Sequence, residues 1–572
     1  MREWSPQVTP HGFQQEMQEN DVNPMTHKEE NRPQNRVPRP IDAVFVGIDV
    51  GTTGVRACAV SNDGEVLAEG AAPIPSQQQS SSMRHTHEQD PRAWWRAVCE
   101  ACGRLLENLD RTRVKREQIH SVCVDGTSGT LVCLDRNGKP CRAAIMYNDR
   151  RGAVQAETLN ALAADHCRTL GYRFAPSFAL VKALWLQENE PECFEDTARF
   201  AHQADFVVER LTDRPAVTDY SNALKTGYDI VTEKWPEWMD RLSGIRERLP
   251  QVVAPGAPVG VISTTAARET GLPPKTRVVA GATDGVAACM ASGANRPGDL
   301  NVTLGTTLVF KAITTQICTH PEGLIYSHKL PENLWLPGAA SNTGAEWTTA
   351  LFPNQEYREW DRLAADRLPS PSIAYPLVRS GERCPFRSDQ AERFFLPEPR
   401  DRLDKYAACL QGVALLERLA YEVIESVAGE SSESVFSTGA ACSSDVWMQL
   451  RTNATGKSYH MRIPLSAATF SAQHSTLEVS PPLLAVSFES SAYFILTLRY
   501  EVSMSGSTQR IVMNCASGVI CEHLQAMRYS GTVVRIQPGA LPRMGLVAGL
   551  GTARRVSLCY RWRRAFVHPG VS

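Results

Sequence analysis

The 572-residue sequence lacks the features that mark a membrane protein or a nucleic-acid-binding protein. Its formal net charge is only −2, so it has no strong field to recruit nucleic acid or an anionic membrane surface. No apolar run reaches the roughly 20 residues that a membrane-spanning helix needs. These absences favour a soluble protein with no nucleic-acid partner and no membrane partner.

Cysteine is not scarce, but paired cysteine motifs are. The 16 cysteines are scattered, and Cys99 and Cys102 form a lone CxxC inside a helical pattern, with no second pair to complete a zinc site. The first 41 residues contain acidic residues and no apolar signal segment, which argues against a secretory signal and a transit peptide. We therefore expect a cytoplasmic protein with reduced thiols, buried and neutral at Cys99 and Cys102.

Both ends of the chain differ in composition from its middle. Residues 1–41 are rich in Gln, Asn, Pro and Glu, which predicts a disordered extension. Residues 461–572 contain 11 Arg and 4 Glu but no Lys and no Asp. This break indicates either an appended segment or sequence that was never selected as part of the fold, so residues 458–572 form an atypical tail.

Two strand–turn–strand segments repeat within the middle of the chain. VFVGIDVGTTGVRACAV, residues 44–60, and LNVTLGTTLVFKA, residues 300–312, each place Gly-Thr-Thr between apolar strands. The turn residues are Gly51, Thr52 and Thr53 in the first segment and Gly305, Thr306 and Thr307 in the second. Turns of this kind suit phosphate groups, and Asp49 beside the first turn suits Mg²⁺ or water. An ordinary hairpin with a solvated Asp49 is the alternative.

Strands alternate with helices after the first segment. HEQDPRAWW predicts a helix from Pro91 to Leu109, capped by Asp90. Short strands are expected at residues 65–69, 120–124, 131–134 and 143–147, which indicates an α/β domain with polar groups at its strand ends. The polar stretches DGTSGT and NDRR supply side chains that can hydrogen-bond the hydroxyls of a ligand: Asp125, Thr127, Asn148 and Asp149. The same residue types also fit solvated turns.

Asp284 is the candidate for the chemistry. In VVAGATDGVAACMASG it lies between a strand at Val278 and Val279 and a helical stretch from Gly285. A carboxylate at such a junction can act as a general base, and it can equally serve only to cap the helix.

Two other motifs carry little functional weight. ATGKS at residues 454–458 ends like a P-loop, but Arg451 stands where a P-loop needs glycine. His85 and His87 form a lone HxH, which is more typical of a polar loop than of a metal site.

With these motifs the chain resembles the FGGY family of carbohydrate kinases from residue 44 to residue 457. The similar stretches are DVGTTG, HEQDP with its tryptophans, DGTSGT, MYNDRR, GATDG, the second GTT and STGAACSSDVW. The resemblance implies an α/β fold of two actin-like, ribonuclease-H-like ATPase domains with a cleft between them. Residues 42–292 would form the sugar-binding domain, and residues 293–457 would form the nucleotide-binding domain.

The resemblance also assigns roles in phosphoryl transfer from ATP. Asp284 matches the catalytic base and contacts the sugar, and Asp49 and Asp284 would hold Mg²⁺, directly or through water. The first GTT turn would border the transferred phosphate, and the second would hold the nucleotide phosphates. In STGAACSS, residues 437–444, Gly439 matches the first glycine of a nucleotide loop, while Ala440 and Ala441 replace glycines.

Within the family, residues 204–229 together with DGTSGT and MYND look most like D-ribulose kinases, and Asn222 is a further family-like position. D-Ribulose is therefore the expected acceptor, with D-xylulose or a polyol as the alternative. A non-catalytic nucleotide-binding protein is the alternative from another class, because the second domain departs from the family pattern at its end. The sequence leaves a homodimer open.

Overall fold

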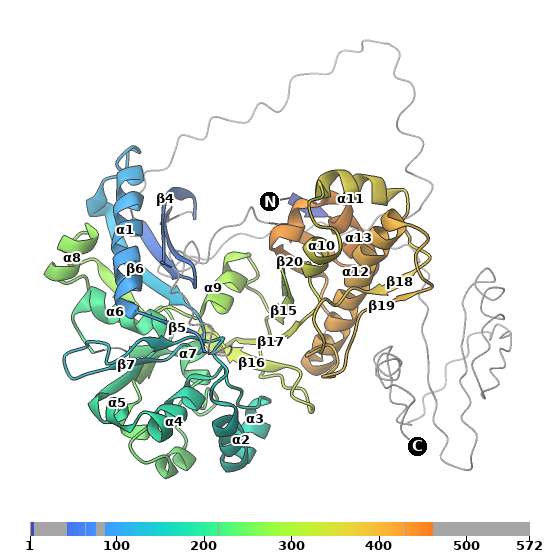
Figure 1. Ribbon diagram of the computed structural model, residues 1–572. Helices are drawn as coiled ribbons and strands as arrows, with labels where there is room; N and C mark the ends of the chain where they lie inside the picture. The colour runs from blue at the N-terminus through green and yellow to red at the C-terminus, as the bar shows by residue number, and fades with distance from the viewer. Residues whose placement is uncertain are drawn as a thin grey trace, which may run out of the picture.

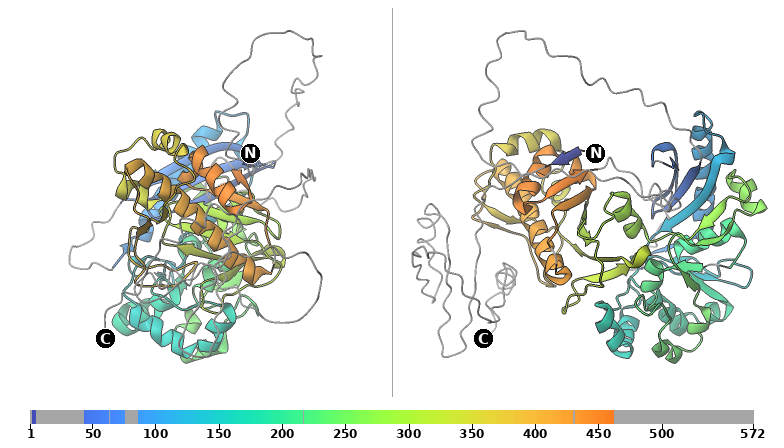
Figure 2. Two further views of the ribbon diagram at one scale, coloured as in Figure 1. Left: turned by 90° about the vertical axis from the view of Figure 1, so that its right-hand side faces the viewer. Right: turned by 180° about the vertical axis from the view of Figure 1, so that it is seen from behind.

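The computed structural model describes residues 2–4, 43–62, 64–75, 86–215, 217–429 and 431–461. The chain forms two lobes, each built on one large sheet (Figure 1). The helix α9 (Asp284–Ala291) and the hairpin of β16 (Tyr326–Lys329) and β17 (Trp335–Ser341) lie between the lobes, as the views in Figure 2 also show.

The sheet of the first lobe has the strand order β12-β13-β6-β2-β3-β4. Strand β2 pairs antiparallel with β3 and parallel with β6, and β13 continues the parallel part. Every residue of β2 is buried, as expected for a central strand covered on both faces. The bounds of the strands are β2 Val44–Val50, β3 Gly54–Ser61, β4 Val66–Pro73, β6 Ile119–Gly126, β12 Pro258–Val261 and β13 Arg277–Val279.

The second lobe repeats this pattern. Its sheet has the order β1-β21-β20-β14-β15-β17-β16, with β17, β15 and β14 antiparallel and β14, β20 and β21 parallel. The five strands β4-β3-β2-β6-β13 therefore correspond to β17-β15-β14-β20-β21, which confirms the duplication. The further bounds are β1 Arg2–Trp4, β14 Leu300–Leu304, β15 Leu308–Ala312, β20 Ser434–Thr438 and β21 Ser458–Met461.

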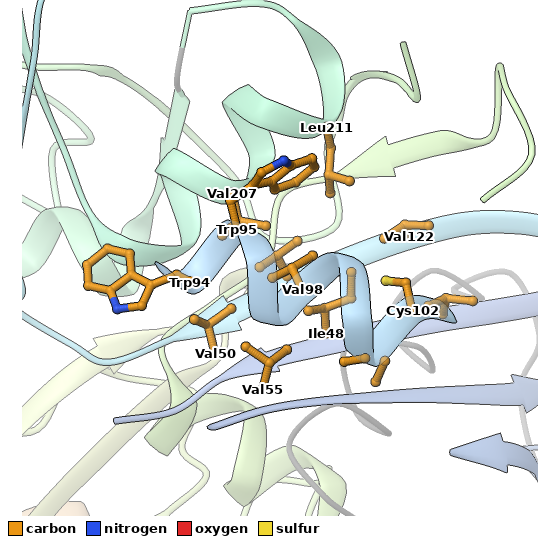
Figure 3. Close-up of a cluster of buried hydrophobic side chains, with 14 of the residues drawn as sticks. Ile48, Val50, Val55, Trp94, Trp95, Val98, Cys102, Val122, Val207 and Leu211 are labelled. Atoms are coloured by element: carbon orange, nitrogen blue, oxygen red, sulfur yellow. The ribbon is translucent and has the colours of Figure 1, made fainter. Parts of the chain in front are cut away.

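One long helix covers a sheet in each lobe. In the first lobe this is α1 (Pro91–Leu109), and Asp90 accepts a hydrogen bond from the Arg92 N–H at 3.0 Å as its predicted cap. In the second lobe the long helix is α12 (Arg402–Ala428), and α13 (Asp445–Thr455) packs beside it. Figure 3 shows Val98 and Cys102 of α1 facing the sheet residues Ile48, Val50, Val55 and Val122, and Trp95 beside Val207 and Leu211 of α6 (Gln203–Thr212).

The CxxC lies within this packing. Cys102 is fully buried, and burial raises the pKa of the Cys99 thiol to about 11. Both thiols are therefore held in the neutral form at physiological pH, which agrees with a packing role.

The remaining elements are shorter. The helices are α2 Ala153–Leu162, α3 Ala164–Leu170, α4 Ala179–Asn189, α5 Pro191–Asp196, α6 Gln203–Thr212, α7 Tyr220–Leu224, α8 Thr264–Thr270, α10 Glu346–Leu351 and α11 Tyr357–Ala365. The strands are β5 Glu88–Gln89, β7 Val132–Leu134, β8 Ala144–Ile145, β9 Arg199–Ala201, β10 Val217–Asp219, β11 Gln251–Val253, β18 Ile373–Tyr375 and β19 Phe394–Leu396. Short 3₁₀ turns occupy residues 116–118, 237–241, 246–248, 331–333 and 440–443. No helix in the described part of the chain is both long and apolar enough to span a membrane.

The two ends differ from the expected boundaries. Arg2–Trp4 form β1, which pairs antiparallel with β21, although the sequence predicts disorder for residues 1–41. Strand β21 belongs to the second sheet, so this lobe continues past residue 457. Residues 5–42 and 462–572, and with them most of the predicted extension and tail, lie outside the described residues.

The packing of α1 generates a stability prediction. Leu105 is fully buried in the first core, so Leu105→Ala should lower the free energy of unfolding by about 2–5 kcal/mol through lost burial and a residual cavity. Urea unfolding followed by tryptophan fluorescence would measure it. The matched control is Arg96→Ala on the exposed face of the same helix, expected within about 0.5 kcal/mol of the parent. Equal effects of the two variants would contradict this description of the core.

Candidate active site

Three strand ends bring three carboxylates to one edge of the first sheet. Asp49 near the end of β2 is the register partner of Asp125 near the end of β6. Gly126, which follows Asp125, forms a parallel bridge with Thr283, the residue before Asp284. Asp125 is fully buried, Asp49 is nearly so, and Asp284 is half-buried. Two residues that the sequence places 235 positions apart, Asp49 and Asp284, therefore share one site.

Backbone packing and a hydroxyl relay fix the segment that carries Asp284. A Cβ atom on Gly281 would lie 1.8 Å from the carbonyl oxygen of Val124, so only glycine allows this approach to β6. The Thr283 N–H donates to Ser221 Oγ at 2.9 Å, and Ser221 Oγ donates to Asp219 at 2.5 Å. These contacts fix the point at which the chain turns into α9.

Asp284 is the first residue of α9, whereas Thr283 holds the N-cap position. Its Oδ1 accepts a hydrogen bond from the Gly285 N–H at 2.6 Å. The carboxylate therefore lies at the positive end of the helix dipole without serving as the capping residue that the sequence also allowed.

The electrostatics of this edge favour bound protons or cations. Burial, and then the charge of Asp284, raise the pKa of Asp49 to about 6, although Arg56 lies 3.7 Å away and opposes the shift. Burial also raises the pKa of Asp284, against the lowering effects of the Gly285 N–H, Lys225 and Lys311. Two incompletely compensated carboxylates in one site attract a cation.

Two lysines that sequence reasoning missed come to Asp284 from different lobes. Lys311 on β15 of the second lobe donates a hydrogen bond to the carbonyl oxygen of Gly285. Lys225, after α7 in the first lobe, donates to the carbonyl oxygen of Ser128 at 3.4 Å. Burial lowers the pKa of each ammonium group, and Asp284 opposes both shifts. No sequence pattern singles out either lysine, except that Lys311 follows the second GTT on its strand.

The first GTT turn is held by the HEQDP motif. The Gly51 N–H donates to the Gly54 carbonyl oxygen at 3.0 Å and closes the turn. Gln89 Nε2 donates to the carbonyl oxygen of Thr52 at 2.8 Å, and Trp94 Nε1 donates to Gln89 Oε1 at 2.7 Å. The motif thereby ties the turn to α1, and the Thr53 side chain remains exposed.

The second GTT turn lies beside the STGAACSS loop. Thr303 and Thr438 are register partners in β14 and β20, and their hydroxyls lie 2.8 Å apart. Gly439 has φ +100°, and a Cβ there would lie 2.4 Å from the Leu304 carbonyl oxygen. Glycine is thus required at Gly439, whereas the alanines that follow it begin the 3₁₀ turn at residues 440–443.

A second support holds the same turn from the other side. The Ala345 N–H donates to the Gly305 carbonyl oxygen at 2.7 Å. A Cβ on Gly344 would come within 2.6 Å of backbone atoms of Gly305, Thr306 and Thr307. The structure therefore brings Gly305, Thr306, Thr307 and Gly439 to one edge of the second sheet.

The four predicted sugar contacts have different surroundings. Thr127 Oγ1 is buried and lies 2.6 Å from Gln203 Oε1. Asp149 is also buried, and its oxygens accept from the Arg151 guanidinium and the His87 N–H. Thr127 and Asp149 therefore have internal hydrogen-bond partners, and a sugar contact of either stays a prediction. Asn148 is exposed.

Asn222 and the histidine pair complete the predicted residues. Asn222 is buried, its Nδ2 donates to Asp219 at 2.6 Å, and its Oδ1 has no partner among the described residues. His87 contributes its backbone to the Asp149 contact, and His85 lies outside the described residues.

The two lobes thus share one sheet topology, with carboxylates at the edge of the first sheet and a Gly-Thr-Thr turn in each lobe. Residues 44–291 match the N-terminal domain of the FGGY family of carbohydrate kinases, and residues 300–469 match its C-terminal domain. The chain belongs to this family and is an ATP-dependent carbohydrate kinase.

Individual relatives agree with this assignment. A xylulose kinase of Bacillus subtilis is 27% identical over 421 residues, which cover 71% of this chain and 82% of that protein. A gluconokinase of Bacillus licheniformis is 25% identical over 428 residues, 71% of this chain and 82% of that protein. The crystal structure of a xylulose kinase from Rhodospirillum rubrum has the same fold, with a TM-score of 0.68 and 23% identity over 75% of this chain and 89% of that one.

The raised pKa of Asp49 predicts a pH-dependent gain in stability for Asp49→Asn. Because the pKa of Asp49 is higher in the folded protein than in the unfolded chain, its carboxyl ionises more readily in the unfolded chain. The free energy of unfolding therefore falls as the pH rises from about 4 to about 6. Without nucleotide at pH 7.5, the free energy of unfolding of Asp49→Asn, measured by urea unfolding, should exceed that of the parent by about 1–3 kcal/mol. At pH 4.5 the advantage should shrink by about 2 kcal/mol. The same advantage at both pH values would contradict the burial of an ionisable Asp49.

Proposed function

We propose that the protein transfers the γ-phosphoryl group of ATP to a hydroxyl of a pentulose, D-ribulose in the first instance, with Asp284 as the general base. The observation that supports this is the position of Asp284. Its carboxylate lies at the start of α9, near Asp49 and Lys225 from the first lobe and Lys311 from the second. A base between two lobes that hold the sugar and the nucleotide separately is suited to in-line transfer.

The chain's own residues would carry out the chemistry as follows. Asp284 accepts the proton of the attacking hydroxyl, whose oxygen forms a bond to the γ-phosphorus as the bond to ADP breaks. Burial raises the pKa of Asp284 toward the working pH, which favours proton transfer. The ammonium groups of Lys225 and Lys311 oppose the negative charge that gathers near Asp284.

Asp49 and Asp284 fit the requirements of Mg²⁺. This ion usually takes one or two protein carboxylates together with waters and phosphate oxygens. The raised pKa values of both carboxyls indicate negative charge that the protein itself does not fully neutralise. When bound, the ion would neutralise charge on the phosphate chain.

The GTT turns and the STGAACSS loop would bind the phosphates and the nucleotide. Gly51, Thr52 and Thr53 approach from the first lobe and Gly305, Thr306, Thr307, Gly439 and Ala440 from the second. For the sugar, the candidate contacts are Asp125, Thr127, Asp149 and Asn222, which are buried, together with Asn148. The side chain of Asn148 is exposed.

D-Xylulose is the second candidate acceptor. Relatives named xylulose kinase match most of the chain, including one of Escherichia coli with 26% identity over 441 residues. D-Ribulose stays first because DGTSGT, MYND and residues 204–229 resemble D-ribulose kinases. The two ketopentoses differ in configuration at one carbon, so contacts to single hydroxyls decide between them.

The first test measures ADP release with MgATP against D-ribulose, D-xylulose, L-ribulose, gluconate and glycerol. The purified full-length protein should turn over D-ribulose fastest. Asp284→Asn should lower kcat by about 100- to 10,000-fold, because it removes the proton acceptor and leaves the shape of the site. The matched control is Asp165→Asn, which makes the same change at an exposed residue of α3 and should keep full activity.

Three outcomes would contradict the proposal in part or in whole. Faster turnover of D-xylulose than of D-ribulose would change the proposed acceptor and leave Asp284 as the proposed base. Turnover unchanged in Asp284→Asn, or no sugar-dependent ADP release from a folded protein, would refute the assigned chemistry.

A further inference from the structure

The core of the second lobe contains an ion pair that the chemistry above does not use. Arg451 on α13 and Glu417 on α12 are both fully buried. The guanidinium binds the carboxylate through two parallel hydrogen bonds, Nε to Oε2 at 2.6 Å and Nη2 to Oε1 at 2.9 Å. The hydroxyls of Tyr421 and Tyr459 also donate to Glu417 Oε1, at 2.5 and 2.8 Å.

Stability alone is a poor explanation for this pair. Burying two charges costs several kcal/mol per ion, and apolar residues of the same volume are often as stable or more so. A two-point guanidinium contact does, however, fix the relative positions of the elements that it joins. Here it joins α12 to α13, and through Tyr459 it also reaches β21. Such an arrangement suits a structure that must be held in one conformation.

The structure that it holds is the STGAACSS loop. Arg451 Nη2 donates a second hydrogen bond, at 3.0 Å, to Ser437 Oγ at the start of the loop. Ser437 Oγ in turn lies 3.2 Å from the Cys442 sulfur, and this contact links two parts of the loop. At the far end, Ser444 Oγ accepts from the Trp447 N–H and caps α13. The loop is therefore fixed from behind by a buried arginine and at its end by a cap.

The residues around Arg451 also explain the false P-loop match. Gly456 ends α13 in the left-handed conformation, and Lys457 Nζ binds Glu425 and the Ser432 carbonyl oxygen. The lysine of ATGKS is thus occupied by protein groups. Arg451, which is buried in the core, contacts the loop at residues 437–444 through Ser437.

We propose that Arg451 and Glu417 are positioning residues for nucleotide binding, and that Ser437 Oγ transmits their position to the loop at residues 437–444. This inference rests on the proposed role of that loop in binding ATP. Because Arg451 is fully buried, its effect on the nucleotide is indirect. Loss of the link should weaken nucleotide binding and leave sugar binding unchanged.

Ser437→Ala tests the link with a small change that preserves the ion pair. By calorimetry with ADP, the full-length variant should bind about five- to tenfold more weakly, the size expected for one hydrogen bond. In turnover assays the KM for ATP should rise by a similar factor, while the KM for the sugar stays constant. The matched control is Ser434→Ala on the same strand, whose hydroxyl makes no hydrogen bond among the described residues, and it should bind ADP like the parent.

Arg451→Lys provides the second variant. Lysine keeps the positive charge but lacks the planar fork that serves Glu417 and Ser437 together, so ADP affinity should fall at least as far. Identical ADP affinity in Ser437→Ala, Ser434→Ala and the parent would overturn the inference and leave the proposed function intact. Equal increases in the KM for ATP and for the sugar would also overturn it, since they would indicate a general structural defect. A parent protein that binds no nucleotide would refute the proposed function and this inference together.

Discussion

The constraint on which the structure depends is the meeting of buried carboxylates at the end of the first sheet. Asp49, Asp125 and Asp284 come from three segments that only the parallel pairing of β2, β6 and β13 places side by side. Burial, and then repulsion between Asp49 and Asp284, oppose this arrangement, which is why the pKa of Asp49 rises to about 6. It persists because glycine at Gly281 and the hydroxyl of Ser221 hold the backbone in place. A site that is unfavourable when empty is ready to bind protons, cations and substrate.

Duplication supplies the other half of the site. The same five-strand order in each lobe places the two GTT turns at corresponding positions of two sheets. The lobes are then joined where the chemistry is proposed to occur, since Lys311 of the second lobe binds the backbone of α9 in the first. Movement of one lobe against the other would therefore change the surroundings of Asp284 directly. Such coupling is typical of enzymes that assemble their site on closure and so exclude water.

In the second lobe, the loop at residues 437–444 must be held in one conformation. A glycine-rich loop is flexible by nature, and in this chain Ala440 and Ala441 stand where the family resemblance predicts glycines. The one glycine that the fold requires, Gly439, remains because Leu304 leaves no room for a Cβ. The rest of the loop is fixed by hydrogen bonds from the core, from Arg451 through Ser437. Local sequence and buried polar contacts thus share the task of shaping one loop.

Much of the fold could be predicted from the sequence. The apolar run of β2, the cap and proline that begin α1, and the repeated GTT turns are local patterns, and each was found where its pattern predicted it. The position of Asp284 at a strand-to-helix junction could also be predicted, since strand and helix signals flank it in the sequence. The internal partners of single residues such as Thr127 and Asp149 could not be predicted, because a polar residue in a turn looks the same whether it faces a ligand or a buried partner.

By itself the sequence determined the elements, the duplication and the family, because these depend on periodicity and short motifs. Only the tertiary structure decided which polar groups meet: Asp49 with Asp284, Lys311 with Gly285, and Arg451 with Glu417 and Ser437. The physical reason is that these contacts join residues from distant segments, and their energies depend on distance and burial. Neither the distance between two such residues nor their burial can be predicted from the local sequence.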